Sequence, residues 1–158
     1  MKHEHEVAKH AALEVGKILL NIYTTDYKID DKGTSPMYSG LNPVTDADRA
    51  SDEYLKTVLT SEFPRYGWFS EETKDSPERL LKDRVWIVDP LDGTKEYIEK
   101  VPMWVVSIAL VENKVPVLGI LYNPVKEELF SAVKGEGANL NGEKVACSTK
   151  TDPSEMVI

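Results

Sequence analysis

The sequence predicts an α+β fold in which two helices pack on an antiparallel sheet. Up to residue 63, the chain carries two segments with apolar residues three or four positions apart, the spacing of one helix face. From residue 85 onward, short runs rich in β-branched residues alternate with turn-forming residues, as in a β-meander. Helices followed by strands favour a layered α+β architecture over an alternating α/β one.

The first helix is expected to span about twenty residues near the N-terminus. Its apolar face repeats every three or four positions, through Val7, Ala11, Val15, Ile18 and Ile22. Gly16 lies inside this pattern and costs about 1 kcal/mol relative to Ala. Residues 24–42 are polar and are predicted to form a loop, which is long for a compact domain, where such loops tend to be functional.

The second helix is expected from about residue 47 to residue 63. Its apolar side chains share one face: Ala47, Ala50, Tyr54, Leu55, Val58 and Leu59. Pro64 ends it, because proline lacks the amide hydrogen that a helix interior needs. Residues 68–70 then form a short apolar strand that leads into Glu71 and Glu72, and residues 73–84 form a charged connector.

The remaining strands are expected at residues 85–89, 104–111, 115–122 and 129–134, with turn residues between them. A hairpin is predicted at residues 139–142, because Asn-Gly is a strong signal for a type I′ turn. Val157 and Ile158 are apolar and are expected to begin another strand. Met103 and Trp104 are expected to lie in the core.

Composition argues against several classes of protein. Apolar residues make up 41% of the 158 residues, which indicates one folded domain. The formal charge of −8 argues against a nucleic-acid polymer as partner, because phosphate backbones attract an excess of Lys and Arg. Residues 101–122 form the longest apolar region, but charged residues and Pro116 interrupt it too often for a transmembrane segment.

Cys147 is the only cysteine, so no disulfide can form within the chain and a cytoplasmic location is expected. We expect this residue to be inert and half-buried at a strand end. The N-terminus lacks the apolar core of a signal peptide, which agrees with that location.

Two carboxylates follow a buried strand within residues 85–97. Asp89 ends an apolar run, and Asp92 follows three positions later on a predicted tight turn. Pro90 fixes φ between them, and Gly93 allows a ligand to approach the backbone closely. Two such carboxylates repel each other unless a cation lies between them, and ligands made only of oxygen suit Mg²⁺. The alternative is a solvated turn, since Asp and Gly are common turn residues.

Two more acidic clusters lie at the ends of expected elements. Glu71 and Glu72 follow the short strand, and Thr45 and Asp48 lie where the second helix begins. The first pair also fits a charged loop, and the second fits an N-cap whose acidic residues complement the helix dipole. Taken together, the three clusters favour a metal site with a nearby bound water, formed by Glu71, Asp89 and Asp92 with Thr94 and Asp48.

These clusters resemble the signature of the inositol monophosphatase superfamily of Mg²⁺-dependent, lithium-sensitive phosphatases. The matching segments are residues 86–94 (Trp-Ile-Val-Asp-Pro-Leu-Asp-Gly-Thr), 70–72 (Ser-Glu-Glu) and 44–48 (Val-Thr-Asp-Ala-Asp). Lys95 and Glu96, followed by the aromatic Tyr97, are similar to the branch that hydrolyses 3'(2'),5'-bisphosphate nucleotides. Inositol phosphatases more often carry Asn before the aromatic. The nucleotidase branch implies a role in sulfur assimilation.

The resemblance implies the fold and its extent. Residues 1–158 correspond to the N-terminal α+β layer of the inositol monophosphatase/fructose-1,6-bisphosphatase-like sandwich. The C-terminal α/β half of a typical member supplies a further metal-binding Asp and much of the substrate pocket, and it is absent from this sequence. Residues 24–42 look expanded relative to the mobile flap that family members carry there.

The resemblance also implies a role for each site residue. The metal ligands would be Glu71, Asp89, the Leu91 carbonyl and Asp92, with Asp89 shared between two ions. Thr94 would orient the nucleophilic water, and Asp48 would accept its proton through the Thr94 hydroxyl. The substrate-binding residues would be Glu71, Leu91, Asp92, Gly93 and Thr94, with the last two backbone amides facing the phosphate.

Three functions follow as expectations. The first is a Mg²⁺-dependent phosphate monoester hydrolase, most similar to enzymes that convert 3'-phosphoadenosine 5'-phosphate to AMP and phosphate. The second is an inositol monophosphatase, also acting on a phosphorylated small molecule. The third is a catalytically incomplete fragment or a metal-binding subunit that needs a partner, for which an exposed apolar sheet face would favour association, including homo-oligomers. Lys95 and Glu96 either contact substrate or are simply exposed, and Arg49 is expected to pair with an acidic neighbour.

Overall fold

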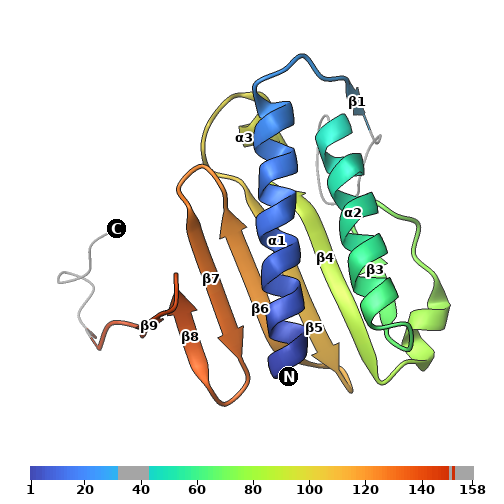
Figure 1. Cartoon of the computed structure of the whole chain (residues 1–158), viewed down its shortest axis with the longest axis vertical. Helices are drawn as coiled ribbons and strands as arrows, with labels where there is room; N and C mark the ends of the chain where they lie inside the picture. Colours follow the sequence, from blue (N-terminus) through green and yellow to red (C-terminus); the bar gives the residue numbers. More distant parts are fainter. Residues whose placement is uncertain (32–42, 150, 152–158) are drawn as a thin grey trace.

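Two long helices lie side by side over one face of a seven-stranded sheet in the computed structural model, which describes residues 1–31, 43–149 and 151 (Figure 1). The helices are α1 (Lys2–Tyr23) and α2 (Asp46–Glu62), close to the predicted bounds. Their apolar faces pack on the strands. Helix α1 packs against β5 (Val105–Glu112) and β6 (Val115–Asn123), and α2 packs against β3 (Gly67–Ser70) and β4 (Arg84–Asp92). The predicted α+β class, with helices on a sheet, is confirmed.

The sheet follows chain order from β3 to β9. Its strands are β3 (Gly67–Ser70), β4 (Arg84–Asp92), β5 (Val105–Glu112), β6 (Val115–Asn123), β7 (Glu128–Val133), β8 (Gly137–Leu140) and β9 (Glu143–Val145). The predicted Asn-Gly hairpin joins β8 to β9, and both turn residues, Asn141 and Gly142, have positive φ as a type I′ turn requires.

One pair of strands departs from the antiparallel pattern and positions the candidate site. β3 and β4 run parallel, and Ser70 is aligned with Val88. The charged connector predicted between them contains a 3-10 helix (Pro77–Leu81) and crosses from the end of one strand to the start of the other. The carboxyl ends of β3 and β4 therefore lie at the same edge of the sheet.

The prediction of a continuous loop over residues 24–42 is wrong at one place. β1 (Ile29–Asp31) pairs with β2 (Pro43–Thr45) as a separate antiparallel ladder just before α2. β1 is exposed at all three positions, so it shows no alternation of apolar and polar residues, and only its backbone pairing reveals it. Residues 32–42 and the strand expected at Val157 and Ile158 lie outside the described residues.

The core lies between the helices and the sheet. Its largest fully buried side chains include Trp86, Trp104, Tyr97, Leu19, Leu55 and Leu110. The prediction for Trp104 is confirmed, but the prediction for Met103 is wrong, since Met103 is 60% exposed. Met103 lies in the irregular segment before β5, where its side chain is exposed while that of Trp104 next to it is buried.

Gly16 lets α1 approach the sheet closely. A Cβ atom at this position would lie 2.4 Å from Cε1 of Tyr122 on β6. The glycine that weakens the helix is therefore required by its packing.

Two further observations concern the surface. Cys147 is exposed beyond the end of β9, which corrects the expectation of a half-buried residue, because the chain has left the sheet by that point. Within the described part of the chain, no helix combines the length and the apolar character needed to cross a bilayer.

Candidate active site

The parallel pairing of β3 and β4 brings Glu71 to Asp89. The Glu71 amide donates to the Val88 carbonyl at 3.2 Å, which extends the strand pairing by one residue. The Glu71 and Asp89 carboxyl groups hydrogen-bond to each other. Burial, this hydrogen bond and the charges of Glu71 and Asp92 together raise the pKa of Asp89 to about 8. Three predicted metal ligands therefore share one region of negative charge.

The backbone after Asp89 is held in a defined shape. β4 continues to Asp92 with a register shift against β5, so the tight turn expected directly after Asp89 is an irregular strand end instead. The Leu91 amide donates to Asp89 Oδ1 at 3.1 Å. Gly93 has φ of +97°, and a Cβ there would lie 3.0 Å from the Met103 carbonyl oxygen. This position therefore favours glycine on both conformational and steric grounds.

Thr94 begins the short helix α3 (Thr94–Ile98) and faces α2. Its Oγ1 lies 3.1 Å from Asp48 Oδ1 and 3.2 Å from the Leu91 carbonyl oxygen. The other oxygen of Asp48 accepts hydrogen bonds from the Thr45 amide and hydroxyl, at 2.7 Å and 2.6 Å. Thr45 and Asp48 thus form the N-terminal cap of α2, as the structural alternative predicted. Asp48 does both: it caps the helix and contacts Thr94.

The donor set suits Mg²⁺ in a particular way. Within the described residues, no three His, Cys, Asp or Glu side chains form a ready-made metal cage. Mg²⁺ rarely requires one, because it usually takes one or two carboxylates and fills its other positions with water and phosphate. Glu71, Asp89 and Asp92 supply carboxylates, and the Leu91 carbonyl is a neutral oxygen nearby. The residues therefore fit a hydrated cation that also binds phosphate.

Sequence reasoning assigned no site role to two polar residues next to this cluster, of which Ser70 appears only as part of the matching segment 70–72. Asp52 on α2 and Ser70 at the end of β3 are both buried, and the Ser70 hydroxyl donates to Asp52 Oδ1 at 2.5 Å. The signal that could have found Asp52 is its spacing, since it lies four residues after Asp48 on the same helix face.

Two further predictions concern residues around the cluster. Arg49 pairs with Asp46 as expected, at 3.5 Å, and also with Asp30 on β1, at 2.5 Å. Lys95 is exposed and Glu96 is half-buried, both on the first turn of α3.

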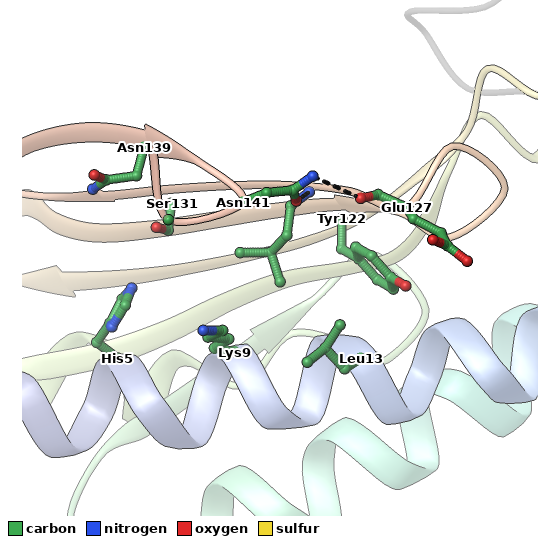
Figure 2. A pocket seen from close by; sticks show the side chains of 10 residues that line it. His5, Lys9, Leu13, Tyr122, Glu127, Ser131, Asn139 and Asn141 are labelled. Carbon is green, nitrogen blue, oxygen red and sulfur yellow. Dashed lines mark hydrogen bonds between the residues drawn. The ribbon is translucent and has the colours of Figure 1, made fainter. Parts of the chain in front are cut away.

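A cavity of about 530 Å³ lies elsewhere, between α1 and strands β6 to β8 (Figure 2). The side chains of His5 and Lys9 point from α1 toward Ser131 and Asn139 on the sheet. None of the predicted site residues lines this cavity. The candidate site is therefore separate from this cavity.

Comparison with known proteins identifies the family to which the chain belongs. The model of the inositol monophosphatase family matches residues 1–158. An inositol monophosphatase from Dictyostelium discoideum is 38% identical over 147 residues, covering 92% of this chain and 52% of that protein.

Two solved structures are similar in both fold and sequence. The extragenic suppressor protein SuhB from Bartonella henselae has a TM-score of 0.82 and 30% identity, covering 92% of this chain and 54% of that one. CysQ from Bacteroides thetaiotaomicron, described as a bacterial member of the same family, has a TM-score of 0.72 and 38% identity, covering 95% of this chain and 53% of that one. The chain thus spans about half the length of the relatives it matches.

Proposed function

The chain belongs to the inositol monophosphatase family, and we propose that its acidic cluster is the metal-binding part of a phosphate monoester hydrolase. The observation that carries the proposal is the convergence of Glu71, Asp89 and Asp92, with the raised pKa of Asp89, beside the Thr94–Asp48 contact. In this arrangement a cation would relieve the repulsion between carboxylates, and a phosphate would meet both the cation and a positioned hydroxyl.

Each residue has a defined task in the proposed reaction. Glu71, Asp89, Asp92 and the Leu91 carbonyl would hold Mg²⁺, which would supply positive charge to the phosphate and lower the pKa of water. Thr94 accepts a hydrogen bond from the attacking water and passes its own proton toward Asp48. The backbone amides of Gly93 and Thr94 face the phosphate oxygens.

The substrate class that we favour is a 3'(2'),5'-bisphosphate nucleotide. Tyr97 does not select between nucleotide and inositol substrates by touching them. Its side chain is buried, and its hydroxyl donates to the Leu19 carbonyl at 2.7 Å. Lys95 is exposed one residue after Thr94. An ammonium group here can pair with a second phosphate, which a bisphosphate nucleotide carries and inositol 1-phosphate lacks.

A second candidate is a metal-binding subunit that needs a partner or further chain for turnover. Two observations favour it: the chain spans about half the length of its relatives, and the sheet face opposite the helices exposes apolar side chains. Leu121 is 44% exposed and Phe130 is 41% exposed, and they are aligned on neighbouring strands. Such a face is typical of an interaction surface.

Phosphate release and particle size together test these candidates. We expect the chain to release phosphate from 3'-phosphoadenosine 5'-phosphate with Mg²⁺, faster than from inositol 1-phosphate, and Li⁺ to suppress the release. Faster release from inositol 1-phosphate would assign the other branch. A monomer that binds Mg²⁺ without releasing phosphate would favour the subunit, and a chain that does neither would contradict the proposal.

A further inference from the structure

One face of α2 carries two buried carboxylates that contact the two turns of the candidate site. Asp48 is fully buried, Asp52 is 5% exposed, and they lie one helical turn apart. Asp48 contacts Thr94, which follows β4, at 3.1 Å. Asp52 contacts Ser70, which ends β3, at 2.5 Å. A single helix therefore touches both of the segments that carry the acidic cluster.

The Ser70 hydroxyl links Asp52 to the backbone of the Glu71–Glu72 turn. A hydroxyl has one proton to donate, and Ser70 gives it to Asp52. Its oxygen then accepts the Glu72 amide at 3.1 Å. Glu71 lies between these two fixed residues, with its own amide bonded to the Val88 carbonyl. The direction of the Glu71 carboxylate toward Asp89 thus depends on the Ser70 hydroxyl.

Asp52 has no evident role in stabilising its own helix. Asp is a weak helix former in a helix interior, and burial of a carboxylate is costly without a donor. Within the described residues, the hydrogen bond that Asp52 makes is the one to Ser70, itself only 2% exposed. A hydrogen bond to a charged group in a buried setting is among the stronger kinds. The stabilising contribution of Asp52 is therefore its hydrogen bond to the Ser70 hydroxyl.

We propose that Asp52 is a positioning residue that sets the Mg²⁺ affinity of the acidic cluster through Ser70 and the Glu71–Glu72 turn. The inference rests on the proposed metal site and adds to it a residue that contacts neither metal nor substrate. Partners that orient metal ligands from outside the coordination sphere typically contribute about 10- to 100-fold in metal affinity. Loss of the Ser70 hydroxyl should have an effect of that size.

Mg²⁺ titration calorimetry on four variants of the full chain tests the proposal. Ser70→Ala and Asp52→Ala should weaken Mg²⁺ binding by about 10- to 100-fold. Asp52→Asn should weaken it less, because the carboxamide oxygen can still accept the Ser70 proton. The matched control is Ser51→Ala, which removes a neighbouring buried hydroxyl of α2 that has no hydrogen-bond partner among the described residues. This control should bind Mg²⁺ within about 3-fold of the unmodified chain.

A second measurement is independent of metal. In the metal-free chain, amide exchange of Glu72 should become at least about tenfold faster in Ser70→Ala and Asp52→Ala, because its acceptor is removed or released. Unchanged exchange of the Glu72 amide in both variants would overturn the proposal, whether or not the unmodified chain binds Mg²⁺. Failure of the unmodified chain to bind Mg²⁺ would instead refute the metal site. Equal Mg²⁺ affinity in all variants, or an equal loss in Ser51→Ala, would also overturn it. If Asp52→Ala does not fold, Ser70→Ala decides the question.

Discussion

The Thr94 hydroxyl lies 3.1 Å from the Asp48 carboxylate, although 46 positions separate the two residues in the sequence. The contact joins the start of α3 to the first turn of α2, and the same carboxylate caps that turn through Thr45. The Asp48 carboxylate contacts Thr45 through one oxygen and Thr94 through the other, so its direction is fixed. Thr94 is therefore presented to the site at a set angle, as proton transfer requires.

Removal of the Thr94 hydroxyl should separate turnover from metal binding. Thr94→Val keeps the shape of the side chain but cannot relay a proton, so phosphate release should fall by about 100-fold or more while Mg²⁺ affinity changes little. Thr60→Val is the control, because the Thr60 hydroxyl lies on the surface of α2 and donates to the Lys56 carbonyl, away from the candidate site. Phosphate release at saturating Mg²⁺ measures the loss of turnover in Thr94→Val. Near-normal turnover in this variant would contradict the proposed relay.

Asp89 and Glu72 should differ sharply in their contribution to Mg²⁺ binding. Asp89 touches Glu71 and lies beside Asp92, so Asp89→Asn should weaken Mg²⁺ binding by about 100-fold or more. Glu72 is the adjacent carboxylate in sequence, and Glu72→Gln removes the same charge from outside the proposed ligand set. We expect less than about a 3-fold change for Glu72→Gln. Calorimetry of both variants checks the difference, and similar losses would point to a general effect of charge.

The stability of the metal-free chain should depend on pH through Asp89. The pKa of Asp89 is raised from 3.8 to about 8, chiefly by burial and by the hydrogen bond and charge of Glu71. The unfolded chain therefore loses this proton first as pH rises. The contribution of Asp89 to stability is complete below about pH 3.8 and is lost as pH rises to about 8.

Urea unfolding at several pH values, compared with Asp89→Asn, isolates this contribution. The variant should lose less stability than the unmodified chain between pH 4 and pH 8, because its amide does not ionise. Saturating Mg²⁺ should restore the stability of the unmodified chain at pH 8 but not that of the variant. Parallel pH profiles for the two proteins would show that Asp89 titrates normally.

Local sequence signals account for most of the elements. Both long helices and the strands after residue 84 follow from periodicity, and the turn at Asn141 and Gly142 follows from its residue types. These signals extend over only a few residues, so each of these elements can be predicted from its own stretch of sequence. The short ladder of β1 with β2 has no such signal, since all three residues of β1 are exposed and only the pairing defines them.

The candidate site likewise combines residues that have a local sequence signal with contacts that have none. Asp89, Asp92 and Thr94 stand out in the sequence, because a buried strand ends beside them. The closeness of Asp89 to Glu71 depends on the parallel pairing of β3 with β4, which periodicity alone does not reveal. The bond of Ser70 to Asp52 is a contact between residues 18 positions apart on different elements. Single-residue patterns contain no information of that kind.

Gly16 offers a test of helix packing against helix propensity. Its φ is not positive, so alanine suits its backbone, and in an open helix Gly16→Ala should gain about 1 kcal/mol. Here the new Cβ would lie 2.4 Å from Cε1 of Tyr122 and 3.0 Å from Cβ of Pro124. Overpacking of this kind typically costs about 1–3 kcal/mol, so the variant should be less stable than the unmodified chain.

A double-mutant cycle on Gly16 and Tyr122 separates the two effects. In a Tyr122→Ala background the principal clash is absent, so Gly16→Ala should become neutral or stabilising. Thermal unfolding of the four proteins gives the interaction free energy, which we expect to be at least about 1 kcal/mol. A gain in stability from Gly16→Ala alone would mean that α1 can move away from β6 at little cost. The spacing between helix and sheet would then be set elsewhere along their contact.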